Sequence, residues 1–124
     1  MLLRMAEETT ELARESWTSY FNDLSRELGV YDVTVEVDGL DVGAQIEAEG
    51  LVLAGMSYDH KDDIVVIGVA PVGGTEAVEH FVSGPQRIFI ETSDSTVPSV
   101  IDIEDGEGQK TIVRLSPAPA LEAG

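Results

Sequence analysis

The sequence contains no cysteine and has little positive charge. Seven lysines and arginines face twenty-four aspartates and glutamates, and Lys61 and Lys110 are the only lysines. Without cysteine the chain has no disulfide, no thiol nucleophile and no cysteine metal site. Nucleic-acid binding depends on lysine and arginine contacts to phosphate. The five arginines, at positions 4, 14, 26, 87 and 114, form no basic stripe, so the sequence argues against a nucleic-acid partner.

Long hydrophobic runs are also missing. The longest, Ile64–Val72, is far shorter than the roughly 20 residues that a membrane-spanning helix needs. The first ten residues lack the apolar centre and the small-residue cleavage site of a secretory signal. These absences predict a protein of the cytoplasm that does not contact a membrane.

Negative charge is present in excess, with a formal net charge of −17. Such a charge repels itself in dilute buffer, whereas at about 1 M salt the Debye length falls to about 3 Å and most of the repulsion is screened. We interpret the composition as adaptation to the salt-rich cytoplasm of a halophile. The alternative is an ordinary acidic protein with a cationic partner. The acids are spread along the chain rather than gathered in one tail, which favours the first interpretation.

Helical periodicity marks the N-terminal part of the chain. Trp17, Phe21, Leu24 and Leu28 recur at the spacing of one helix face, which predicts a helix over about 9–28. Thr9 or Thr10 is expected to cap its start and Gly29 to end it, and Trp17 and Phe21 are expected in the core.

After Gly29 the period changes to two, as in Val33, Val35 and Val37. Residues 31–116 divide into six or seven short strands separated by short turns, with a flexible tail at 117–124. Short turns favour antiparallel pairing. The fold prediction is therefore α+β in a single domain, 1–124. An N-terminal helix packs on a curved, mostly antiparallel sheet or a small, partly closed β-barrel.

The acid-rich segment Asp59-His60-Lys61-Asp62-Asp63 has two interpretations. It is either a metal or acid/base site, or the turn between two strands. Five consecutive residues between strands cannot converge on one ion unless the loop curls around it, whereas a polar loop of four or five residues is a common hairpin length. We therefore predict a turn. The segment Asp105-Gly106-Glu107-Gly108 has hairpin turn chemistry as well.

His80 is the most interesting residue for chemistry. In an extended segment it shares an apolar face with Val78 and Val82. No second histidine stands at zinc-ligand spacing, so its possible roles are a general base oriented by a carboxylate or a ligand of a divalent ion. Its candidate partners are Glu76, Glu79, Asp59 and His60. None of these residues forms a catalytic or metal signature, so no catalytic, cofactor-binding or metal-ligating residue is assigned. Phe21, Phe81 and Phe89 are expected in the core.

The order of motifs resembles a known family. An aromatic helix precedes YDVTVEVDG, GAQIEAEGLVLAGMSYD, VEHFVSGPQRIFI and SVIDIEDGEGQKTIVRLSP. The pattern covers Trp17 to Pro117, and its most specific pieces are Gly43-Ala44-Gln45, the His80 segment up to Pro85, and Asp105-Gly106. It resembles a family of small, uncharacterised bacterial and haloarchaeal proteins that is known only as a domain of unknown function. The resemblance implies one compact domain and a halophilic source, and it implies no activity or cofactor.

The leading functional prediction is a non-catalytic β-rich module that binds another protein or a second copy of itself. It depends on the lack of a reactive constellation and on the free edges that short strands leave in a small sheet. The alternatives are a small-ligand or divalent-metal binder or enzyme that uses His80 with nearby carboxylates, and a nucleic-acid-binding barrel, which the charge disfavours.

Overall fold

The computed structural model describes residues 8–27, 31–39, 43–71, 77–92 and 97–117. Eight strands form one sheet, and every pairing is antiparallel. The helical elements are a short 3-10 helix, Arg14–Ser16, and helix α1, Trp17–Glu27. The strands are β1 (Glu8–Glu11), β2 (Tyr31–Gly39), β3 (Gly43–Asp59), β4 (Ile64–Ala70), β5 (Val78–Ser83), β6 (Pro85–Thr92), β7 (Val100–Asp105) and β8 (Lys110–Pro117). The α+β class with an open, antiparallel sheet is confirmed.

The strand count was predicted too low because β1 was assigned to the helix. Thr9 and Thr10 do not cap a helix. They lie in an edge strand that pairs with β6, and the N–H of Leu12 continues this ladder by donating to the carbonyl of Ile88 (2.8 Å). Threonine is β-branched and favours strands, and here a distant partner strand is available to pair with it. Helical periodicity in the sequence does not reveal that partner.

Helix α1 is shorter than predicted, since it begins at Trp17 rather than near residue 9 and ends at Glu27. Its core face is confirmed, because Trp17, Phe21 and Leu24 are all buried. Leu28 and Gly29, the expected end of the helix, lie outside the described residues. Within the described ranges, no helix has the length and hydropathy needed to cross a bilayer.

Strand β3 is the longest element and belongs to two pairings. Its first part pairs with β2 up to Val52, and its second part pairs with β4 from Val52 onward. The β2–β3 register shifts in the stretch that contains Gly50, and the β3–β4 register shifts next to Gly55. Bulges increase twist and bend the strand. The bends in β3 therefore allow its first part to lie in one layer of the folded sheet, beside β2, and its second part in the other, beside β4.

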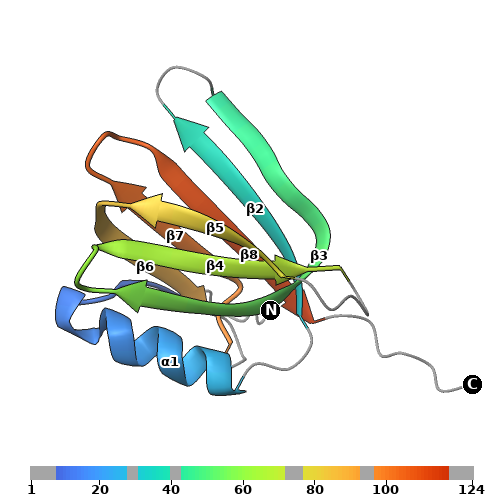
Figure 1. Cartoon of the computed structure of the whole chain (residues 1–124), viewed down its shortest axis with the longest axis horizontal. Helices are drawn as coiled ribbons and strands as arrows, with labels where there is room; N and C mark the ends of the chain where they lie inside the picture. Colours follow the sequence, from blue (N-terminus) through green and yellow to red (C-terminus); the bar gives the residue numbers. More distant parts are fainter. Residues whose placement is uncertain (1–7, 28–30, 40–42, 72–76, 93–96, 118–124) are drawn as a thin grey trace, which may run out of the picture.

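The sheet has the order β1-β6-β7-β8-β2-β3-β4-β5 and folds back on itself. In Figure 1, β3, β4 and β5 lie in front of β7 and β8, and α1 runs along the lower side. Side chains of both layers and of the helix share one core, which includes Phe21, Ile67, Ile88, Ile101 and Val113. The sheet does not close into a barrel, because β1 and β5 remain its two edges.

Candidate functional site

The acid-rich segment between β3 and β4 is a turn, as predicted. Strand β3 ends at Asp59 and strand β4 begins at Ile64. The Oδ1 atom of Asp59 accepts the backbone N–H groups of Lys61 (3.0 Å) and Asp62 (3.4 Å). The carboxylate of Asp59 therefore stabilises the turn backbone, as aspartate commonly does.

The last residue of this turn, Asp63, takes part in a cluster that the sequence did not indicate. Tyr58 donates its hydroxyl proton to the carboxylate of Asp63 (2.6 Å), and Arg14 contacts both groups and the carbonyl of Pro85. The Arg14 guanidinium also stacks on the ring of Trp17, 4.3 Å from its centroid. The hydrogen bond to Asp63 raises the pKa of Tyr58, with burial adding to the effect. The cluster ties the 3-10 helix to the β3–β4 turn and to the start of β6.

Strand β5 becomes more exposed toward its beginning. Val82 is buried and His80 is half-buried, but Val78 on the same face is 65% exposed. The segment is extended, which is the conformation in which Val78, His80 and Val82 share one face. The prediction that Phe81 belongs to the core is wrong, because its side chain is 55% exposed on the opposite face. Phe21 is buried as predicted, and Phe89 is half-buried.

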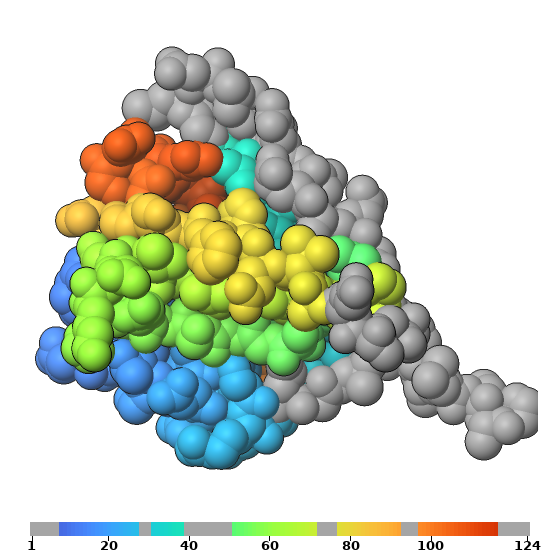
Figure 2. All heavy atoms as spheres, in the orientation of Figure 1, coloured from blue at the N-terminus to red at the C-terminus, as the bar shows by residue number. Residues whose placement is uncertain are grey.

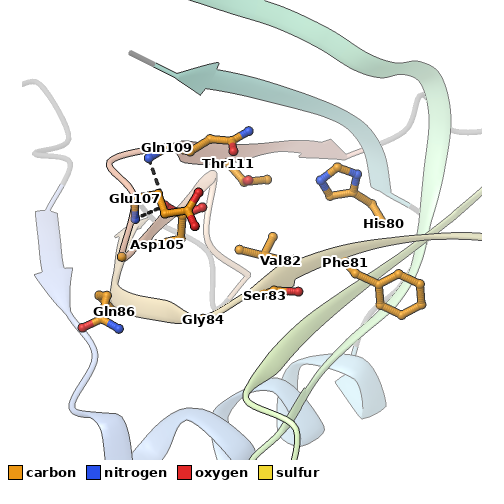
Figure 3. Close-up of a pocket in the computed structure, with 11 residues that line it drawn as sticks. His80, Phe81, Val82, Ser83, Gly84, Gln86, Asp105, Glu107, Gln109 and Thr111 are labelled. Atoms are coloured by element: carbon orange, nitrogen blue, oxygen red, sulfur yellow. Dashed lines mark hydrogen bonds between the residues drawn. The ribbon is translucent and has the colours of Figure 1, made fainter. Parts of the chain in front are cut away.

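A hollow of about 550 Å³ lies between β5 and the turn that joins β7 to β8. Figure 3 shows His80 at one end and the polar groups of the turn, Asp105, Glu107 and Gln109, at the other. At the turn end the N–H of Gly106 donates to the carbonyl of Gly84 (3.2 Å), which joins β5 to the turn. The lining residues are His80, Phe81, Val82, Ser83, Gly84, Gln86, Asp105, Gly106, Glu107, Gln109 and Thr111.

The carboxylates expected to accompany His80 do not line this hollow. Glu79 precedes His80 on the strand, so its side chain points to the other face, where it lines a different hollow. Asp59 and His60 lie at the β3–β4 turn, and Glu76 lies outside the described residues. Within the described residues, no group of three or more histidine, aspartate or glutamate side chains has an arrangement that could hold a metal ion.

The hydrogen-bonding phase of β5 follows from one bond at its end. The N–H of Gly84 donates to the carbonyl of Asp63 (2.9 Å), in line with the β4–β5 register. In an antiparallel ladder, residues bonded to the partner strand alternate with residues whose backbone groups point away. Val82 and His80 therefore bond to β4. The N–H and C=O groups of Glu79, Phe81 and Ser83 face the open edge.

The other edge of the sheet, β1, is shielded by charge. Its sequence, Glu-Thr-Thr-Glu, is exposed at every position. Glu11 forms an ion pair with Arg87 (3.2 Å), and that hydrogen bond, rather than burial, lowers the pKa of Glu11. Charged side chains protect an edge strand from pairing with another chain. Figure 2 shows β5 (yellow) in full view between β4 and the β7–β8 turn, so this edge, which exposes Val78 and Phe81, is accessible as well.

A single acidic residue stands apart from these features. Asp102 of β7 lies on the outer face of the sheet beside Phe89 and Ile112, its partners in the register. Its Oδ1 atom is buried and has no hydrogen-bond partner among the described residues, and burial raises the pKa of this carboxyl. The burial of Asp102 was not predicted from the sequence, because it depends on which strands lie beside β7.

Comparison with known proteins agrees with the motif order. A model of a family of unknown function, DUF5335, matches residues 8–123. The chain belongs to this family. An uncharacterised protein of Aquifex aeolicus (strain VF5) is 34% identical over 113 residues, covering 91% of this chain and 96% of that protein. No solved structure matches. The resemblance to an uncharacterised family is thereby confirmed, and membership in DUF5335 brings no established activity with it.

Proposed function

We propose that the protein is a binding module that takes up an extended segment of another chain as an additional strand beside β5. The observation that carries the proposal is the contrast between the two edges of the sheet. Strand β1 presents glutamates, whereas β5 presents Val78 and Phe81, which are 65% and 55% exposed. The backbone groups of Glu79, Phe81 and Ser83 supply the hydrogen bonds that strand addition requires.

The hollow beside β5 supports the same function. It borders four consecutive positions of the strand, His80 to Ser83, and then Gly84, so it follows the backbone edge rather than surrounding a single side chain. An added strand lies about 4.8 Å from its neighbour and places alternate side chains on the two faces of the sheet. Side chains on the inner face would then lie above Val82 and Thr111, which are buried beneath the hollow.

We also propose that the module works in a salt-rich cytoplasm. The support is the net charge of −17, whose self-repulsion is screened in molar salt.

A backbone substitution provides a direct test of strand addition. The N–H of Phe81 faces the open edge, so Phe81→Pro removes one edge donor and leaves the bonds to β4 intact. We expect short peptides selected from a random displayed library to bind the wild-type protein and to lose binding to Phe81→Pro. Isothermal titration calorimetry measures both affinities, and circular dichroism confirms that the variant is folded.

The opposite edge supplies a matched control. The N–H of Leu12 bonds to Ile88, so by alternation the N–H of Thr9 also points away from the sheet, and Thr9→Pro makes the same change at β1. This variant is expected to bind the selected peptides as the wild type does. If the peptides bind Phe81→Pro with unchanged affinity, or if selection yields no binder, strand addition at β5 is wrong.

A further inference from the structure

We infer that the segment bound beside β5 is basic at the end that lies next to the β7–β8 turn. This inference rests on the proposed function and specifies its partner. The occupant is an extended stretch of a different protein, with lysine or arginine at that end and β-branched or apolar residues along the rest. The evidence is the distribution of charge and apolar surface around the hollow.

Two carboxylates, Asp105 and Glu107, stand at the turn end, and no lysine or arginine lines the hollow. Asp105 uses one oxygen, Oδ1, to accept the N–H groups of Glu107 (2.8 Å) and Gln109 (3.0 Å), as Figure 3 shows. These bonds fix the position of the carboxylate and leave its negative charge beside the hollow. A cationic side chain that arrives there meets the fixed carboxylate of Asp105 and the exposed Glu107 of the same turn.

The remainder of β5 is suited to uncharged side chains. Phe81 and Val78 expose apolar surface, and between them stand Glu79 and His80 on opposite faces. A residue paired with Phe81 lies on the same face as its ring, where cross-strand contacts with an aromatic favour β-branched partners. The preferred segment therefore combines a basic end with alternating β-branched residues.

Charge also favours a different protein over a second copy of this chain. Pairing β5 with the β5 of another copy brings together two molecules that each carry a net charge of −17, and β5 itself contains Glu79 but no lysine or arginine. Like charges in close contact oppose association, whereas opposite charges increase both its rate and its specificity. At low salt a basic partner gains from the field that a second copy has to overcome, and at molar salt only the attraction between charges in direct contact remains.

Two synthetic peptides with blocked ends test the inference. The first has the sequence lysine–threonine–valine–threonine–valine–threonine–lysine, and the second replaces both lysines with glutamate. At about 0.1 M salt we expect the lysine peptide to bind measurably more tightly, by about 10-fold or more, with the preference shrinking at about 1 M salt. Isothermal titration calorimetry gives the affinities, and amide shifts in NMR spectra report whether residues 79–84 respond.

Substitutions in the turn identify the acids responsible. The double substitution Asp105→Asn with Glu107→Gln keeps the hydrogen-bond acceptor at position 105 and removes both charges. It is expected to weaken binding of the lysine peptide by about 3- to 10-fold. Glu27→Gln, an exposed change on α1, is expected to leave the affinity unchanged. Equal binding of the two peptides, or an undiminished preference in the double variant, would overturn the basic-segment inference.

Failure of this inference is distinguishable from failure of strand addition. If charge has no effect but Phe81→Pro still abolishes binding, strand addition stands and the basic partner is wrong. If Phe81→Pro binds as the wild type does, strand addition itself is wrong. Sedimentation velocity tests the remaining possibility, that a second copy of this chain binds at β5. A dimer that Phe81→Pro dissociates and Thr9→Pro does not would assign the edge to a second copy and overturn the inference of a different protein.

Discussion

Tyr58 donates a 2.6 Å hydrogen bond to Asp63 across the base of the β3–β4 turn. The bond joins the end of one strand to the residue just before the next. Asp63 has a φ of 58°, a left-handed conformation that aspartate tolerates better than most residues. Arg14 approaches the same pair from the 3-10 helix, so this bond also helps to hold the N-terminal segment in place.

Removing the Tyr58 hydroxyl should destabilise the protein. Tyr58→Phe keeps the edge-to-face contact with Trp17 (5.1 Å between ring centroids) and loses the bond to Asp63. We expect a loss of about 1 kcal/mol in the free energy of unfolding, which lowers Tm by roughly 3–6 °C. Because the folded-state pKa of Tyr58 is raised above 10.0, this stability is present below pH 10 and is lost as the pH rises through the raised pKa.

Thermal unfolding followed by circular dichroism measures the effect at pH 7 and at about pH 11. Tyr20→Phe serves as the control at pH 7, because Tyr20 is a half-buried tyrosine of α1 and no hydrogen bond of its hydroxyl is found among the described residues. A Tyr58→Phe protein as stable as the wild type at pH 7 would show that the bond makes no net contribution.

Ser25 is expected to be the most sensitive serine of the helix. Its Oγ accepts the N–H of Met56 (3.0 Å) and donates to the carbonyl of Met56 (2.9 Å), on the part of β3 that has passed beyond β2. Ser25→Ala leaves both backbone groups without these bonds in a part-buried position, at a cost of about 1–3 kcal/mol. Urea unfolding gives the difference directly.

Ser19→Ala is the matched control for that experiment. Ser19 lies on the same helix, and its hydroxyl donates only to the exposed carbonyl of Ser16 (3.2 Å). Its loss should change the free energy of unfolding by less than about 0.5 kcal/mol. Equal effects of the two substitutions would contradict a special role for the Met56 contact.

Asp102→Asn should stabilise the protein at neutral pH. Burial raises the pKa of Asp102 above 3.8, so the folded state resists ionisation of this group. Ionisation of Asp102 therefore costs stability. The free energy of unfolding falls as the pH rises from the pKa of Asp102 in the unfolded state through its raised pKa in the folded state. We expect the Tm of Asp102→Asn to be higher by about 2–4 °C at pH 7, and the gain to disappear near pH 3, where Asp102 is neutral as well. The control is Asp62→Asn in the exposed β3–β4 turn, which should show no gain in Tm. A lower Tm for Asp102→Asn would instead mean that the charged form of Asp102 has a stabilising partner.

Salt should stabilise the protein through its carboxylates. Raising KCl from about 0.1 M to about 2 M shortens the Debye length from about 10 Å to below about 3 Å and screens the repulsion of a net charge of −17. We expect a gain of more than about 1 kcal/mol at pH 7, seen as a rise in Tm of roughly 3–6 °C or more. The sequence pI is about 4.1, so the same experiment near pH 4 should show a much smaller response. An equal response at both pH values would point to a general salting-out effect.

Local patterns in the sequence determined the element types in most of the chain. Alternation fixed the strand character of the segment around Val33–Val37, and glycine-containing turns marked the ends of strands. The chemistry of Asp59–Asp63 identified that segment as a turn, because aspartate side chains bond to nearby turn amides whatever the rest of the fold does. The spacing of Trp17, Phe21 and Leu24 predicted the buried helix face, since apolar residues at the helical period lie on one side of the helix.

Only the tertiary structure decided how these elements are used. The Thr-Thr-Glu segment was predicted to be helical, but in the structure it pairs with β6 as a strand. Phe81 was predicted to lie in the core, but it is exposed, because hydrophobicity alone does not show which strand lies at the edge of the sheet. The separation of His80 from Glu79, the meeting of Tyr58, Asp63 and Arg14, and the exposed β5 edge beside Asp105 all depend on strand order. Strand order arises from contacts between residues far apart in the chain, and a single sequence carries no local signal for such contacts.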